Sequence, residues 1–538
     1  MKKIKLTKYF LAAILAFSIT SCHDDLDLMP NDPDMITEND VFANATQAKS
    51  ALAKVYATLA ITGQEGPAGD GDIQGVDEGG SQFTRSLFTL NVITTDEAIV
   101  GWGDAGLPNM HGLNWGSDNN FIGGMYYRLA ATVSYANSFI KNAEGLAAND
   151  PEVKEYIAEA RFIRAYAYYN LMDLFANVPL VTEISSALPT QSNRQEIFTF
   201  VESELLDIQN QLKQEKNEYG RVDKVAAYAL LSRLYLNAET WINQNKYTES
   251  VTYSKLAINS FYTLHTTDVN GNGTAYDELF LADNDSNGAQ NEFIFALNFD
   301  GNNSKTYGGS TFLVKGSIGG DMLPAEWGVN DKWGGQRSTK ALVSKFQSNQ
   351  NDSNGNPIGW ADKRAKFYTT DHTYEINSVS DFSNGYAVVK FSNKKSDGTN
   401  GNDATGQYAD TDIPVIRVAE IYLNYAEAVL RGGAGGDLNT ALTYINALRT
   451  RGYGNASGNV TLADLNLNFI LDERSRELYW EGTRRTDLIR FNKFVSGYDW
   501  PFKGNVAGGT SVSDIRKIFP IPLNIITINP NLTQNPGY

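Results

Sequence analysis

Residues 223–260 read DKVAAYALLSRLYLNAETWINQNKYTESVTYSKLAINS and carry the clearest evidence for the fold class. Two segments with helical periodicity, 223–243 and 247–260, are separated by the short polar turn Asn243-Gln244-Asn245-Lys246. Small side chains lie on both segments, at Ala226, Ala227, Ala229, Ser250 and Ala257. Antiparallel helices pack closely where small residues let their backbones approach, so this stretch predicts a tightly packed helix pair.

The same pattern continues in both directions along the chain. Helical periodicity is also present at 46–60, 124–145, 151–175, 195–212, 417–432, 438–452 and 465–492. The pair at 417–452 again carries small residues, at Ala426, Ala428, Ala441 and Ala447. Repeated helix pairs of this kind are typical of tetratricopeptide repeats. We therefore expect a mainly α fold, with a tetratricopeptide-like helical scaffold at about 46–60, 124–260 and 416–538.

Two segments between these helices have a different composition. Gly, Asn, Asp and Ser dominate 261–415, which also contains strand-like runs at 292–298 and 386–391. Segment 61–123 is rich in glycine and is interrupted by Trp102 and Trp115. We expect long loop-rich, partly β insertions within a single domain spanning 46–538. Loops on a rigid frame are where binding surfaces usually lie.

The N-terminus predicts a lipoprotein. Lys2, Lys3, Lys5 and Lys8 precede an apolar run, 10–19, that is about half the ~20 residues needed to span a bilayer. The run ends in Ile19-Thr20-Ser21-Cys22, which looks like a lipobox, in which the cysteine is acylated and becomes the mature terminus. We expect a signal peptide at 1–21 and a lipidated N-terminus and tether at 22–45. The alternative is an ordinary signal peptide with an incidental cysteine.

Cysteine usage favours the lipobox. Cys22 is the only cysteine among 538 residues, so the chain has no disulfide framework. A lone thiol in an oxidising compartment invites unwanted pairing, which attachment to lipid prevents. Multiple acyl chains hold a protein stably at a membrane. His23, Asp24, Asp25 and Asp27 after the cysteine resemble an acidic export signal of cell-surface lipoproteins, or else form a solvated acidic linker.

Charge and composition exclude two classes of protein. The formal net charge is −17, and such a chain repels phosphate backbones, so we expect no nucleic-acid partner. Aromatic residues at 12% and apolar residues at 42% exclude a disordered chain.

Catalytic signatures are absent from the sequence. The four histidines, at 23, 111, 265 and 372, form no H-E-x-x-H motif, and no G-x-S-x-G elbow, Walker loop or dinucleotide fingerprint occurs. We expect no enzyme and no catalytic cofactor. Glycoside hydrolysis stays open as an alternative, because 62 acidic residues offer pairs whose separation only the fold decides.

Several longer motifs occur in order along the chain. EARFIRAY at 159–166 is followed by DLF at 173–175 and VPL at 178–180; DIP at 412–414 is followed by RVAE at 417–420. DERSREL at 472–478 is followed by EGTRRTDL at 481–488, and FPIP occupies 519–522. With these motifs the chain resembles the SusD/RagB family of nutrient-binding outer-membrane lipoproteins.

The resemblance implies a scaffold, a location and a partner. The family has a tetratricopeptide-like helical layer and sits as a lid on a TonB-dependent barrel of the SusC type. It implies a lipid-anchored protein exposed at the cell surface on the outer membrane. The charged motif residues belong to the scaffold, where we expect ion pairs between helices at Arg161, Arg164, Glu473, Arg484 and Arg485.

Within the family, the binding loops are most similar to those of the starch-binding founder. The matching stretches are Asp77-Glu78-Gly79 through Phe83 and Arg85, Thr95-Asp96-Glu97 through Trp102, Tyr307-Gly308-Gly309-Ser310-Thr311, and Trp333 before Lys345-Phe346. The resemblance implies that Trp102, Tyr307 and Trp333 stack on sugar rings. It implies that Asp77, Gly79, Arg85 and Asp104 complete the carbohydrate-binding set.

The chain also departs from that founder. Val100 occupies the position of an expected tryptophan, and the amide expected after Trp102 is replaced within Gly103-Asp104-Ala105. The aromatic arc is therefore shorter, which weakens the expectation of starch as the ligand more than the expectation of glucan binding in general. An aromatic residue taken alone more often packs in the core, but the position of these three in glycine-rich loops favours exposure.

The resemblance also implies a structural calcium ion. Asp283-Asn284-Asp285-Ser286-Asn287-Gly288 matches the first half of an EF-hand loop, but the twelfth position is Ile294 instead of Glu. Asp285, Asp410 and Asp412 match positions of a calcium site in the starch-binding relative. The alternative is a solvated acidic turn.

We therefore expect a non-catalytic lipoprotein that captures a glucan, such as starch or maltooligosaccharides, and delivers it to a SusC-type transporter. A sugar ring has an apolar face and a polar rim, so aromatic planes with flanking hydrogen-bonding groups suit it. The first alternative is the same role for another ligand, such as a β-glucan or a peptide. The second is a glycoside hydrolase on a helical frame.

Overall fold

The computed structural model describes residues 38–67, 71–77 and 79–538. The predicted signal peptide, Cys22 and most of the tether lie outside the described residues. None of the helices in the described part of the chain combines the length and the apolar content that crossing a membrane requires.

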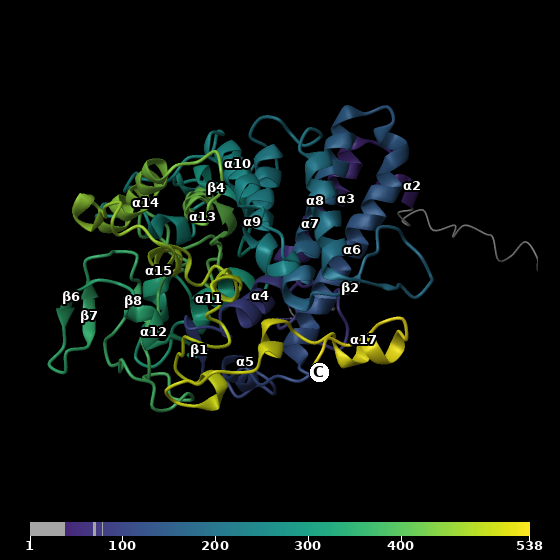
Figure 1. Ribbon diagram of the computed structural model, residues 1–538. Coiled ribbons are helices and arrows are strands. Elements are labelled where there is room, and N and C mark those ends of the chain that lie inside the picture. The colour runs from purple at the N-terminus through teal and green to yellow at the C-terminus, as the bar shows by residue number, and fades with distance from the viewer. Residues whose placement is uncertain (1–37, 68–70, 78) are drawn as a thin grey trace, which may run out of the picture.

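The scaffold is a series of helices that pack in sequence order. α3 (Ala45–Ala60) and α6 (Asn120–Ala147) pack beside α7 (Pro151–Phe175), and α8 (Arg194–Ile208), α9 (Lys224–Ile242) and α10 (Tyr247–Ile258) follow. α13 (Val418–Leu430) packs on α10, and α14 (Leu438–Tyr453) packs on α13. Figure 1 shows these helices side by side across the upper part of the molecule. The predicted mainly helical, tetratricopeptide-like fold is confirmed.

The α9/α10 pair forms as its sequence predicts. α9 ends at Ile242, and the capping residue Asn243 has a φ of 55°, in the left-handed region that asparagine tolerates. α10 packs on α9, and the small side chains of Ala226, Ala229 and Ala257 are all buried. The hydroxyls of Ser232 and Ser254 meet at 2.7 Å across the pair.

One predicted helix is broken. Instead of a continuous helix over 465–492, the chain forms α15 (Leu467–Leu478) and α16 (Arg484–Arg490). Between them Trp480 and Gly482 have φ values of 66° and 78°, which no helix accommodates. The backbone N–H of Trp480 donates to Glu97 at 2.9 Å, and the indole is buried. The break therefore inserts Trp480 into the core.

The insertion segments contain short helices and small antiparallel sheets. One sheet has the order β1 (Ala98–Val100), β5 (Gln336–Ser338), β9 (Ala387–Val388) and β8 (Phe367–Tyr368). A second sheet pairs β4 (Phe293–Leu297) with β10 (Ile413–Arg417). Two further pairs of short strands are β2 (Val178–Pro179) with β3 (Gln191–Ser192), and β6 (Ser348–Asn351) with β7 (Pro357–Trp360). The strand-like run at 292–298 is confirmed as β4, whereas only two residues of the run at 386–391 form a strand.

Helices within the insertions carry or support the site. They are α4 (Phe83–Asn91), α5 (Pro108–Gly112), α11 (Gly309–Gly316) and α12 (Lys340–Val343). The chain also forms α2 (Glu38–Val41) before the scaffold and α17 (Leu523–Ile528) near the C-terminus. Hydrophobic periodicity did not predict α4 and α11, because each is only two or three turns long and lies in a glycine-rich segment.

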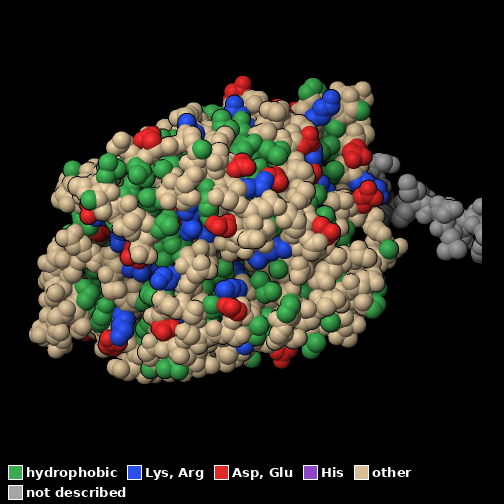
Figure 2. All heavy atoms as spheres, in the orientation of Figure 1, with side chains coloured by type: hydrophobic (Ala, Val, Ile, Leu, Met, Phe, Trp, Pro, Cys, Tyr) green, Lys and Arg blue, Asp and Glu red, His purple; other side chains and the backbone are tan. Residues whose placement is uncertain are grey.

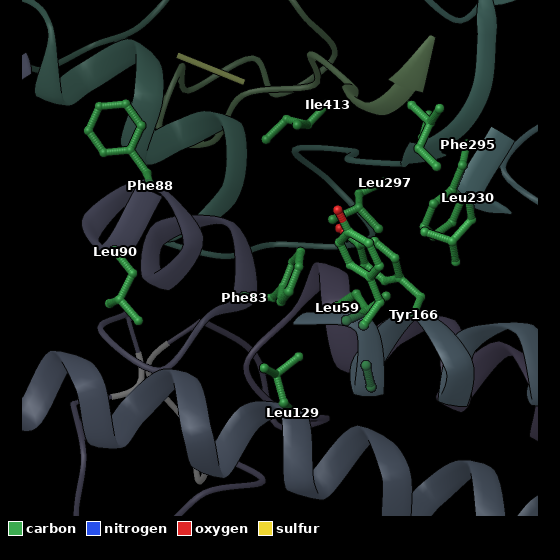
Figure 3. Packing of buried hydrophobic residues seen from close by; sticks show 14 of the residues in the cluster. Leu59, Phe83, Phe88, Leu90, Leu129, Tyr166, Leu230, Phe295, Leu297 and Ile413 are labelled. Carbon is green, nitrogen blue, oxygen red and sulfur yellow. The ribbon is translucent and has the colours of Figure 1, made fainter. Parts of the chain in front are cut away.

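One hydrophobic core joins insertions and scaffold. Figure 3 shows Phe83 of α4 facing Tyr166 of α7, and the two rings pack edge to face at 5.9 Å. Phe295 of β4 packs on the same tyrosine at 5.5 Å. The binding segments therefore rest on the helical layer as a rigid support.

The expected ion pairs are present, with one difference in partner. Arg161 and Arg164 both reach Glu204 of α8 at 2.7 Å, and Arg485 lies 3.4 Å from Asp173 of α7. Glu473 pairs with Arg449 of α14 at 2.8 Å. Arg484 pairs instead with Asp96 at 2.7 Å, in the loop between α4 and β1, so this pair links the scaffold to an insertion.

Candidate functional site

The predicted sugar-binding residues line a single open cavity. Its volume is about 380 Å³, and its lining consists of Asp77, Gly79, Arg85, Trp102, Asp104, Tyr307 and Trp333. These residues come from four separate parts of the sequence, 77–85, 102–104, 307 and 333. The structure thus brings together all seven residues that the resemblance implies.

Strand pairing brings the two tryptophans together. β1 and β5 are antiparallel with Val100 opposite Gln336, and the N–H of Gly101 donates to the carbonyl of Gly335 at 2.9 Å. The chain leaves the sheet on either side of this pair, so Trp102 and Trp333 are neighbours. The indole N–H of Trp102 donates to the carbonyl of Trp333 at 3.0 Å, which fixes the orientation of its ring.

Gln82 connects the other two sides of the cavity. Its side-chain oxygen accepts from the N–H of Arg85 at 2.9 Å, where it caps α4. The same oxygen accepts from the N–H of Gly309 at 3.0 Å, at the start of α11. Gln82 is fully buried. One amide thereby sets the position of Arg85 relative to Tyr307, two residues before Gly309.

The polar side of the cavity is organised around Arg85. Its guanidinium stacks on the ring of Phe312 at 5.1 Å. Burial lowers the pKa of Arg85, while the negative charges of Asp77 and Asp104 raise it. The arginine is therefore a fixed cation between two exposed carboxylates, with donors and acceptors suited to sugar hydroxyls. Gly79 keeps this corner open, since a Cβ there would lie 2.8 Å from Arg85 Nη1.

The aromatic side is a sequence of tilted rings. Trp102, Tyr307 and Trp333 are all half-buried. The rings of Tyr307 and Trp333 lie 6.5 Å apart at an angle of 51°. Each ring therefore offers an accessible face in a different direction, as an arc does.

Tyr408 extends this arc and was missed by sequence reasoning. Its ring lies 5.3 Å from that of Tyr307 at an angle of 48°, and it is half-buried. Burial and a hydrogen bond with Tyr307 raise its pKa. The signal in the sequence was an isolated tyrosine in a polar loop, about 100 residues from Tyr307, which no spacing rule connects to the site. Val100, by contrast, is buried in β1 and adds nothing to the arc.

The three carboxylates assigned to calcium lie near one another without forming a ligand set. Asp412 accepts from the N–H of Phe299 at 2.6 Å and from the hydroxyl of Tyr219 at 2.7 Å. Asp410 accepts from the N–H groups of Gly301 and Asn402. Asp285 is exposed.

These hydrogen bonds hold Asp410 and Asp412 in place, and each carboxylate oxygen keeps a further lone pair. Burial, together with the charges of Asp285 and Asp410, raises the pKa of Asp412 to about 8. Within residues 38–67, 71–77 and 79–538, no three Asp, Glu, His or Cys side chains are arranged to hold a metal. As placed, the oxygens of Asp410 and Asp412 serve protein donors, so calcium stays a prediction.

Comparison with known proteins agrees with this architecture. A family model described as "SusD family" matches residues 364–538, and one described as "Starch-binding associating with outer membrane" matches residues 94–236. Two solved structures share the fold. Surface glycan-binding protein A from Bacteroides fluxus has a TM-score of 0.68 and 20% identity, covering 92% of this chain and 99% of that one. A SusD superfamily protein from Parabacteroides distasonis has a TM-score of 0.69 and 21% identity, covering 94% and 100%.

A curated relative is similar along almost the entire sequence. The starch-binding protein SusD of Bacteroides thetaiotaomicron is 34% identical to this chain over 98% of both sequences. The chain belongs to the SusD family.

Proposed function

We propose that this protein captures a glucan in the cavity between Trp102, Tyr307 and Trp333 and delivers it to a SusC-type TonB-dependent transporter. The single observation that supports this role most is the cavity itself. Three half-buried aromatic rings from separate loops meet a polar corner formed by Asp77, Arg85 and Asp104.

The chemistry of the cavity suits a carbohydrate. Each aromatic contact contributes roughly 0.5–1.5 kcal/mol beyond the burial of area, so three rings provide useful but modest affinity. The polar corner supplies donors and acceptors for hydroxyl groups. The cavity is shallow and open, which suits capture of a polymer whose neighbouring units rebind at high effective concentration.

The angles between the rings favour an α-glucan. An α-1,4-linked glucan curves, whereas a β-1,4-linked glucan forms a flat ribbon. The 51° angle between Tyr307 and Trp333 and the further 48° to Tyr408 match a curved chain better than a flat one. The relative's name, starch-binding protein SusD, points to the same ligand class.

The charge distribution argues against a polyanionic ligand. On the face shown in Figure 2, Lys and Arg side chains are dispersed among Asp and Glu instead of gathering in a basic patch. The net charge of −17 repels polyanions further.

A panel of immobilised polysaccharides tests the ligand class. We expect starch, glycogen or pullulan to retain the protein, and Trp102→Ala, Tyr307→Ala and Trp333→Ala each to weaken retention with little change in Tm. Trp327→Ala is the matched control, because Trp327 is half-buried against Tyr368 outside the cavity. Retention by β-glucans alone would transfer the role to another glycan, and retention that survives all three variants would refute the site.

The protein acts as a binder and not as a hydrolase in this proposal. A reducing-sugar assay on purified protein with the retained polysaccharide distinguishes the two. We expect no release of reducing ends above that of a blank. Release that Asp77→Asn or Asp104→Asn abolishes would establish a glycoside hydrolase instead.

Anchoring and a transporter complete the proposed role. The lipobox at Cys22 supplies membrane attachment, and a lid that stays attached during opening needs an interface at least as large as the standard ~1,600 Å². Mild detergent extraction is expected to co-purify the protein with a much larger barrel. Recovery as a lone monomer from membranes that contain the barrel would contradict the lid role and leave a tethered binder.

A further inference from the structure

Buried arginines in this protein are consistently paired with carboxylates, with one exception. In the described part of the chain, every other buried arginine has a carboxylate oxygen within 3.5 Å of a guanidinium nitrogen. Arg337 on β5 is fully buried and has no such partner among the described residues. A buried guanidinium without a counter-charge is strongly unfavourable, so this exception needs an explanation.

The groups around Arg337 satisfy only part of its hydrogen-bonding capacity. Nη2 donates to the carbonyl of Val379, and the ring of Phe382 lies 5.8 Å from the guanidinium carbon. Nε and Nη1 are buried and have no hydrogen-bond partner among the described residues. Asp381 is the acid that influences Arg337 electrostatically. However, Asp381 is exposed, and it accepts from the N–H and hydroxyl of Ser383.

His111 on α5 is a second buried side chain without partners. It is 8% exposed, and both ring nitrogens lack a hydrogen-bond partner in the described structure. Burial, and then the positive charge of Arg337, lowers the pKa of His111 to about 4. The ring is therefore neutral at physiological pH, with one N–H that donates to no group of the described residues.

The elements that carry these two groups are joined through β1, the strand that leads into Trp102. α5 packs on β1, and β1 pairs with β5 so that Ile99 lies opposite Arg337. Arg337 Nη1 lies 2.8 Å from where a Cβ on Gly101 would be, directly before Trp102. The unpartnered donors of Arg337 therefore lie in the interior of the protein, next to the backbone that leads from β1 into Trp102.

We propose that Arg337 and His111 form an internal binding site for a small inorganic anion of the size and charge of chloride. An anion accepts hydrogen bonds from Nε or Nη1 of Arg337 and from the N–H of His111. It also supplies the counter-charge that carboxylates supply to the other buried arginines. A water molecule would fill the hydrogen bonds but would leave the charge uncompensated.

Crystals of the full mature chain soaked in sodium bromide test the site directly. We expect an anomalous bromide peak within hydrogen-bonding distance of both Arg337 and His111. A peak with the scattering of water, or no peak, would overturn the proposal whatever any variant does.

Chloride dependence of stability is the second measurement. At constant ionic strength, replacing sodium isethionate with sodium chloride is expected to raise the Tm of the wild type by roughly 2 °C, because a ligand that binds only the folded state stabilises it. Arg337→Met is expected to lose this response. Arg161→Met is the matched control and keeps it, because Arg161 already pairs with Glu204 at 2.7 Å.

The two measurements together leave no neutral outcome. A bromide peak with no chloride response in the wild type would mean an adventitious ion only, and would overturn the proposal. If Arg337→Met keeps the rise of Tm with chloride, the ion stabilises the protein at other sites, and this result would also overturn the proposal. If Arg337→Met fails to fold, His111→Phe replaces it, since it removes the second donor while keeping an apolar ring beside Phe502 at 6.4 Å.

Discussion

Gly79→Ala is the sharpest test of the polar corner of the cavity. A Cβ at this position would lie 2.8 Å from Arg85 Nη1, 3.2 Å from Asp77 Oδ1 and 3.8 Å from the Cβ of Tyr307. Ordinary contact begins at 3.4 Å, so the end of Arg85 must move by about 0.6 Å. Arg85 can move because the atom in the way is the far end of a flexible side chain. The substitution should therefore change binding without unfolding the protein.

The size of the effect follows from the displaced hydrogen bond. A hydrogen bond to a charged group contributes ~1.5–3 kcal/mol, and a shift of this size forfeits roughly half of it. We expect the Kd for a maltooligosaccharide to rise roughly four- to twelvefold, since the loss is about 0.75–1.5 kcal/mol and 1.4 kcal/mol corresponds to a factor of ten. Stability should stay equal or rise slightly, because alanine reduces the entropy of the unfolded chain.

Isothermal titration calorimetry and thermal melting measure the two quantities separately. Gly80→Ala is the matched control: its Cβ would meet Asp77 only at ordinary contact distance, 3.4 Å from the carbonyl oxygen and 3.6 Å from Oδ1. An unchanged Kd for a folded Gly79→Ala protein would refute the role of Arg85. An equal loss of affinity in both variants would mean that the loop, and not the corner, was disturbed.

Three further predictions concern anchoring, the core and the metal. Cys22→Ala is expected to leave a precursor that fractionates away from the outer membrane when no barrel is present, because acylation supplies the membrane affinity; its recovery in that membrane would refute the lipobox. Glu477→Gln is expected to cost about 3–5 kcal/mol in the free energy of unfolding, because this buried carboxylate pairs with Arg364, Arg417 and Arg451. Asp207→Asn, at a carboxylate with a 58% exposed side chain, should cost at most about 1 kcal/mol. Burial alone would raise the pKa of Glu477, but the three arginines hold it at about 2; its stabilisation is therefore complete above pH 4.5 and is lost as the pH falls toward 2. Urea titrations between pH 2 and 7 measure that loss, and an acid dependence identical in Glu477→Gln would contradict it. Calcium is expected to raise the Tm of the wild type and not that of Asp412→Asn. An equal Tm of the wild type in calcium and in EDTA would contradict the predicted calcium site.

The scaffold was predictable because its signals are local. Helical periodicity, the Asn243 turn and the small residues of the α9/α10 pair all act within a few turns, and the structure places these helices where the sequence predicts them. The break at Trp480 was not predictable. Its cause is a contact with Glu97, almost 400 positions away, which overrides the local preference for helix.

Which residues line the cavity could be inferred from the sequence only through the family resemblance. Trp102 and Trp333 are 231 positions apart, and they meet because the register of β1 and β5 joins them. No periodicity or spacing encodes that register, since both strands are only three residues long. Gln82, which links α4 to α11, looks like any polar residue in the sequence.

The sequence by itself therefore determined the helical class and, through family motifs, the residue types at the site; its anchor signal at Cys22 stays a prediction. Only the tertiary structure decided that Tyr408 joins the arc, that Gly79 holds a corner open, and that Arg337 lies buried without a carboxylate. The physical reason is that propensity and patterning act between neighbours in the chain, whereas exposure, ring angles and charge pairing depend on segments that long-range packing brings together.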